Sequence, residues 1–118
     1  MKKSFADIYL QFLELATALR EGPNGDALEP VDIQILQELV LCWRRGAPLH
    51  VREAMHLSNI ASPATLHKRI KKLRDLGLIT AARNDTDARS RSLVPTDLAL
   101  KHFSDLGSTL LKVAKGHL

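Results

Sequence analysis

The sequence has 118 residues, of which 45% are hydrophobic, and this amount of apolar material predicts a single small domain over residues 1–118. Seventeen Lys and Arg stand against 13 Asp and Glu, so the formal net charge is +4, which favours a polyanionic partner. The single cysteine, Cys42, excludes an internal disulfide, and acids such as Asp7 interrupt every long apolar run near the N-terminus. We therefore expect a cytoplasmic protein without an export signal, a membrane span or a membrane partner.

The first half of the chain predicts two amphipathic helices. Apolar residues recur at helical spacing from Ser4 to about Arg20, and the turn-forming sequence G-P-N-G follows at 22–25. Proline is favoured at the first position of a helix, so Pro30 predicts the start of the second one, whose apolar stripe ends before Gly46. This second helix is expected to be the central one.

The second half of the chain predicts three more helices and a hairpin. A short helix over about 51–57 precedes a longer one that opens at Ser62, whose hydroxyl can cap it. Short strands over 78–82 and 92–94 enclose a polar loop. Thr96 is expected to cap the last helix.

This order of elements predicts a mainly α fold with a small β wing, of the winged helix-turn-helix type. The winged core is expected over residues 28–95, flanked by helices in 1–22 and 96–118. The apolar faces of the two flanking helices exceed what one small winged domain can cover. We therefore expect these helices to pair across a two-fold axis in a homodimer.

Positive charge is concentrated in about a quarter of the chain. The residues from Ser62 to Arg91 include eight Lys or Arg and three acids, a net charge of +5. The other 88 residues include nine basic and ten acidic side chains, a net charge of −1. A positive field focused on one helix and one hairpin is typical of a nucleic-acid-binding surface.

The helix that opens at Ser62 is amphipathic in a way that suits the major groove of DNA. At about 100° per residue, the apolar side chains from Leu66 to Leu73 face one side, and Lys68 and Lys71 face the other. Small residues at the start of the helix would allow close approach to base edges, while the lysines reach phosphates. A solvated lysine-rich face is the better interpretation of such a helix in isolation, but the adjoining elements favour a recognition helix.

The same region resembles the MarR family of transcriptional regulators. S-P-A-T-L-H-K-R-I at 62–70, followed by L-R-D-L-G-L-I at 73–79, is similar to the recognition helix of that family and the turn into its wing. D-A-R-S at 87–90, with Thr96 opening the next helix, resembles the D-x-R-S pattern of its wing. The resemblance covers roughly residues 28–100.

The resemblance implies a dimeric, sequence-specific regulator of transcription, most simply a repressor, whose partner is double-stranded DNA. The recognition helix, about 62–76, would enter the major groove, and the wing, 83–91, the minor groove, where negative potential attracts Arg89. Asp87 would restrain Arg89 by a charge-assisted hydrogen bond, with an ordinary surface ion pair as the alternative. Ala88 replaces an arginine often found in the family. The expected DNA-contacting residues are Ser62, Ala64, Thr65, His67, Lys68, Lys71 and Lys72 in the helix, and Arg83, Asp87, Arg89 and Arg91 in the wing.

Other chemistries have less support in the sequence. The five histidines and Cys42 lack a ligand spacing such as C-x-x-C, so neither a metal site nor a cofactor is expected, and Cys42 fits a small buried hydrophobe better than a redox sensor. No nucleophile motif, phosphate-binding loop or carboxylate pair indicates an enzyme. A second function stays open, in which the same basic surface of the winged helix docks an acidic protein. The residues specify neither the operator sequence nor any small-molecule effector.

Overall fold

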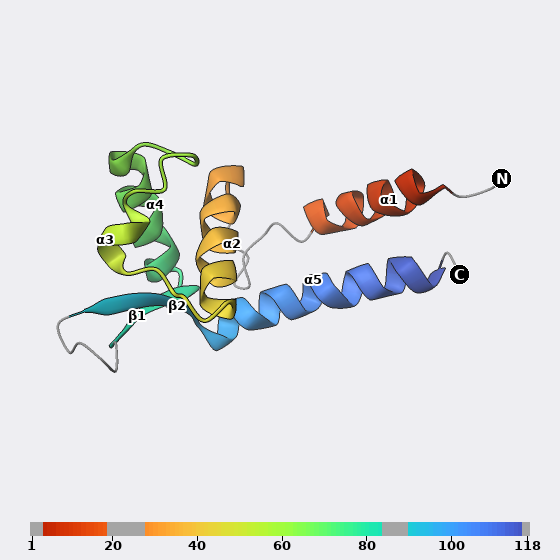
Figure 1. Cartoon of the computed structure of the whole chain (residues 1–118). Coiled ribbons are helices and arrows are strands. Elements are labelled where there is room, and N and C mark those ends of the chain that lie inside the picture. The colour runs from red at the N-terminus through yellow and green to blue at the C-terminus, as the bar shows by residue number, and fades with distance from the viewer. Residues whose placement is uncertain (1–3, 19–27, 84–89, 117–118) are drawn as a thin grey trace. The chain divides into compact units, whose positions relative to one another are not determined.

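The computed structural model describes residues 4–18, 28–83 and 90–116, which form two compact units (Figure 1). One unit consists of residues 28–99, and the other contains the first helix and the last helix from Leu100 onward. The elements in chain order are α1 (Phe5–Ala18), α2 (Pro30–Arg44), α3 (Val51–Ala54), α4 (Pro63–Asp75), β1 (Ile79–Arg83), β2 (Arg91–Pro95) and α5 (Asp97–Gly116). The expected mainly α fold with a two-stranded wing is confirmed. The count of one domain over the whole chain stays a prediction.

The helix starts follow from local capping chemistry. Pro30 occupies the first turn of α2, where a missing N–H costs nothing, and the carboxylate of Asp32 accepts a hydrogen bond from the backbone N–H of Glu29 at 2.9 Å. At α4 the Ser62 hydroxyl accepts the backbone N–H of Thr65 at 3.3 Å, as the sequence predicts. These caps provide acceptors for backbone N–H groups at the helix starts, which have no carbonyl partner within the helix.

The short third helix ends earlier than the sequence predicts. The expected range was about 51–57, whereas α3 stops at Ala54. The next backbone N–H groups, of Met55 and His56, bond to carbonyls three residues back, at Arg52 and Glu53, so the chain tightens into turns.

The hairpin is antiparallel, with Ile79 opposite Pro95 and Arg83 opposite Arg91. β1 is shifted by one residue from its expected range of 78–82, and β2 extends one residue beyond each end of its expected range of 92–94. Gly77, between α4 and β1, has φ of 76°, a left-handed conformation that favours glycine after a helix.

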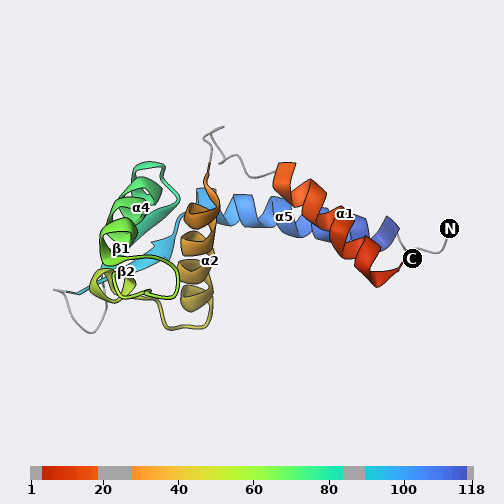
Figure 2. The ribbon, with the colours of Figure 1, turned by 90° about the horizontal axis from the view of Figure 1, so that it is seen from above.

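The core of the 28–99 unit is formed where α2, α4 and the hairpin meet. In both views α2 and α4 lie side by side (Figures 1 and 2). The hydroxyl of Thr96 donates to the carbonyl of Gly77 at 2.6 Å and accepts the backbone N–H of Ala99 at 3.2 Å, which joins the start of α5 to the turn after α4. The buried apolar side chains of this unit are Leu28, Ile35, Leu36, Leu39, Ala54, Leu66, Ile70, Leu73, Leu78, Ile79, Leu93 and Ala99.

The other unit leaves much apolar surface in contact with solvent. No residue of α1 is buried, and Phe5 is 92% exposed. In α5, Val113 is buried, whereas Leu110 and Leu111 are each about half exposed. None of the helices in the described ranges is long and apolar enough to span a bilayer.

Candidate nucleic-acid interface

The helix α4 presents one apolar and one basic face. Leu66, Ile70 and Leu73 are buried at helical spacing and hold the helix against the core. Lys68 and Lys71 are exposed, as the periodicity predicts. Burial of one face thus fixes which side of α4 meets solvent, and that side is cationic.

The N-terminal turn of α4 carries small polar groups. Ser62 and Ala64 are exposed and Thr65 is partly exposed. The Ser62 hydroxyl lies 3.1 Å from that of Thr65, so the cap and the side chain of the first turn form one connected group. His67, also exposed, follows on the next turn. This end of the helix has no bulky side chain that would prevent close approach to a base edge.

Two of the exposed cations differ in their partners. The ammonium of Lys71 lies 3.0 Å from the carboxylate of Asp75, one turn along the same helix, and both side chains are well exposed. No described residue forms an ion pair with Lys68. A surface pair of this kind is worth about 0 to 1 kcal/mol, so it leaves Lys71 available to another anion.

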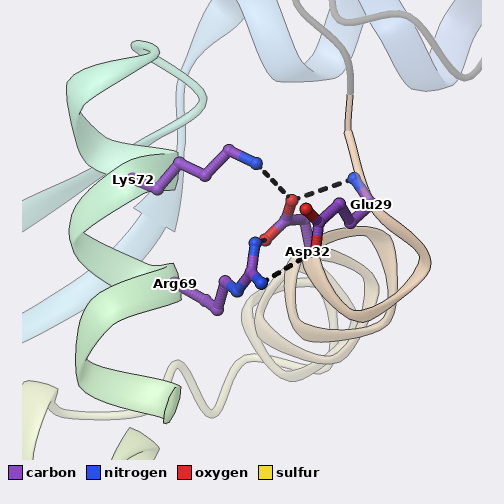
Figure 3. Close-up of polar contacts among 4 residues, drawn as sticks. All are labelled: Glu29, Asp32, Arg69 and Lys72. Atoms are coloured by element: carbon purple, nitrogen blue, oxygen red, sulfur yellow. Dashed lines mark hydrogen bonds and ion pairs between the residues drawn. The ribbon is translucent and has the colours of Figure 1, made fainter. Parts of the chain in front are cut away.

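The structure does not group Lys72 with Lys68 and Lys71. Its ammonium lies 2.6 Å from Oδ2 of Asp32, whose side chain is completely buried at the start of α2 (Figure 3). The same oxygen accepts the backbone N–H of Glu29 at 2.9 Å. Lys72, one of the residues expected from the sequence to contact DNA, thus has its ammonium group against a buried acid of α2.

Arg69 completes this group of four charged residues, which we call the Asp32 cluster: Glu29, Asp32, Arg69 and Lys72. The guanidinium of Arg69 lies 3.5 Å from Oδ1 of Asp32 and 2.8 Å from Oε2 of Glu29 (Figure 3). Two acids and two bases leave the cluster without net charge. Of the five cations in α4, two are therefore neutralised by α2, and Lys68, Lys71 and Arg74 remain on exposed positions.

The Asp32 cluster was not predicted from the sequence. Asp32 precedes the buried Ile35 and Leu36 by three and four residues, so it falls on the apolar face of α2. An acid on an apolar stripe is a local signal that a cationic partner lies opposite. That signal does not identify the partner, because Lys72 lies 40 residues further along the chain.

The wing is described only at its base. Arg83 and Arg91 face each other across the two strands, and both are exposed. Asp87 and Arg89, the pair to which the sequence assigned the minor-groove contact, lie outside the described residues. The base is tied to the rest of the unit by His50, whose Nδ1 lies 2.9 Å from the hydroxyl of Ser90.

The surroundings of Cys42 and of the described histidines give no support for a redox or metal site. The thiol of Cys42 lies 3.6 Å from Oε1 of Glu38 and 3.7 Å from the guanidinium of Arg45, and it is partly buried. In the ranges 4–18, 28–83 and 90–116, no three His, Cys, Asp or Glu side chains are grouped so that they could hold a metal ion.

Comparison with solved structures identifies the fold. A mutant of ZitR from Lactococcus lactis matches with a TM-score of 0.53 and 22% identity, over 97% of this chain and 80% of that one. A Bacillus cereus protein assigned as a MarR-like transcription regulator matches with a TM-score of 0.52 and 13% identity, over 95% and 75% of the two chains. A Pseudomonas aeruginosa protein assigned as a transcriptional regulator matches with a TM-score of 0.52 and 17% identity, over 98% of this chain and 84% of that one.

These matches confirm the fold that the sequence motifs predict: the chain has the winged-helix fold of MarR-like regulators. No protein-family profile matches the chain. A search of curated protein sequences also gave no significant match.

Proposed function

We propose that the protein is a regulator of the MarR type that binds double-stranded DNA and has no enzymatic activity. The observation that carries the proposal is the exposed basic face of α4, directly opposite its buried face. Lys68 and Lys71 stand on that face, and small side chains occupy the N-terminal turn. This arrangement fits a helix lying in the major groove, with the lysines on flanking phosphates.

The wing supplies a second set of contacts in this proposal. Arg83 and Arg91 at the base of the hairpin lie beside phosphates, and Arg89 enters the minor groove with Asp87 as its hydrogen-bond partner. Ser62, Ala64, Thr65 and His67 face base edges or the adjacent backbone. In this proposal the protein acts in the cytoplasm.

The proposed active form is a homodimer. The exposed apolar side chains of α1 and α5 would be covered by the same helices of a second copy, as expected for an isologous interface. Two recognition helices related by a two-fold axis would read an inverted repeat, with half-sites about one helical turn of DNA apart or a small multiple of it.

The test is selection of duplex DNA from a random library by the purified full-length protein, followed by binding measurements on the winning duplex and on a scrambled duplex of the same base composition. We expect an enriched inverted repeat, bound about 10³-fold or more tightly than the scrambled duplex at physiological salt. The DNA upstream of the protein's own gene is a second probe in a mobility-shift assay. Failure to enrich any sequence, together with binding to an acidic polypeptide, would replace the proposal by the protein-docking alternative.

A further inference from the structure

The Asp32 cluster connects the recognition helix to the start of α2 at two points one turn apart. Lys72 and Arg69 extend from the same side of α4 and meet one carboxylate, as Figure 3 shows. A single contact fixes the position of a helix at one point. Two contacts separated by one turn also fix its rotation about its own axis and its shift along that axis.

The apolar contacts of α4 do not provide the same constraint. Leu66, Ile70 and Leu73 are buried, but hydrophobic burial is non-directional and tolerates small rotations and slides. An ion pair with a 2.6 Å separation is directional, and the carboxylate of Asp32 is fully shielded from bulk solvent. Any rotation of α4 that withdraws Lys72 therefore leaves a buried charge with fewer partners.

The cluster is poorly arranged for stability alone. Nε of Arg69 is buried and has no hydrogen-bond partner among the described residues, and the contact of Arg69 with Asp32 is long, at 3.5 Å. Buried ion pairs can often be replaced by apolar residues at no loss of stability, whereas polar groups in a core can define one geometry among several. A role in defining the orientation of α4 therefore accounts for this cluster better than a role in stability.

We infer that Asp32 is a positioning residue for the recognition helix, and that Lys72 and Arg69 act as its anchors rather than as contacts to DNA. The inference rests on the proposed function. Asp32 sets the angle at which the first turn of α4 meets base edges, so it governs the discrimination between DNA sequences. Contacts to phosphates, which Lys68 and Lys71 make, depend less on that angle, because every sequence presents the same backbone.

The experiment compares wild type and Asp32→Asn on the selected duplex and on its scrambled counterpart, over a range of salt concentrations. Asp32→Asn preserves the shape of the side chain and removes the charge that holds the two cations. We expect affinity for the selected duplex to fall by about ten-fold or more, while affinity for the scrambled duplex stays within about two-fold or rises, since the net charge near DNA increases. Both measurements are made at a temperature where thermal melting shows each protein to be folded.

Asp75→Asn is the matched control. It also removes an acid, but one that lies on α4 itself, where Asp75 pairs with Lys71 of the same helix and forms no ion pair with a described residue of another element. We expect this variant to bind both duplexes slightly more tightly and to keep their affinity ratio.

Lys72→Met keeps the inference testable if Asp32→Asn does not fold, because Asp32 then retains Arg69 and the backbone N–H of Glu29. We expect Lys72→Met to lower the ratio of the affinity for the selected duplex to that for the scrambled duplex. The salt slope on the scrambled duplex should stay unchanged. A slope that falls by about one per subunit would show that Lys72 contacts phosphate, and would overturn its role as an anchor.

The failures are distinguishable. If the wild type does not separate the selected from the scrambled duplex, the proposed function fails. If the wild type separates them and Asp32→Asn lowers both affinities equally, with unchanged salt slopes, Asp32 is only structural and the positioning role is refuted.

Discussion

Lys68→Ala tests whether the exposed face of α4 meets the DNA backbone. The Lys68 side chain is exposed, and no described residue pairs with it, so its removal should change the free energy of unfolding by less than about 0.5 kcal/mol. If each subunit of a dimer places this ammonium on one phosphate, two contacts are lost. At about 0.9 per contact, the slope of log K against log salt should become shallower by about 1.8.

The same slope gives the expected loss of affinity. Between 1 M and 0.15 M salt, two contacts account for about 1.5 logarithmic units, so Lys68→Ala should bind about 30-fold more weakly at 0.15 M and almost equally at 1 M. The loss should be the same on the selected and scrambled duplexes, because phosphates carry no sequence information. Fluorescence anisotropy over a salt series measures both quantities.

Lys112→Ala is the control for net charge. It removes an exposed lysine from α5, outside the basic segment 62–91, and should leave the salt slope unchanged. Equal slopes for Lys68→Ala, Lys112→Ala and wild type would refute the reasoning, because they would show that the basic face of α4 does not approach the backbone.

Three further predictions concern the wing, a helix cap and assembly. Arg89→Ala should weaken operator binding by about 1 to 3 kcal/mol per half-site and leave the melting temperature unchanged. Arg89→Lys should restore only part of the lost affinity, and Asp87→Ala should cause a smaller loss of affinity. Wild-type affinity of Arg89→Ala at physiological salt would rule out the minor-groove contact. Ser62→Ala should destabilise the protein by about 1 kcal/mol in urea unfolding, because it leaves the N–H of Thr65 without its cap, whereas Ser62→Asp should keep most of the stability. Light scattering at micromolar concentration should give the mass of a dimer, and Leu10→Glu on the exposed surface of α1 should shift it toward the monomer; a monomeric wild type would contradict the proposed assembly.

Elements that depend on local interactions can be predicted from the amino-acid pattern. Pro30 and Ser62 mark the starts of α2 and α4, and the recurrence of leucine and isoleucine every three or four residues determines which face of α4 is buried. The concentration of positive charge between 62 and 91 is likewise a property of the sequence alone. Together with the two short strands and the MarR-like motifs, these features predicted the winged fold and the basic face.

Lys71 and Lys72 are neighbours in sequence and similar in chemistry, but they have different partners in the folded protein. Lys71 is on the exposed face with Asp75, and Lys72 contacts Asp32 across the interface between α4 and α2. The partners differ because a buried carboxylate pairs with whichever cation the packing of two helices brings within reach. Sequence spacing gives the direction of a side chain about its own helix axis, but not which group of another helix lies opposite.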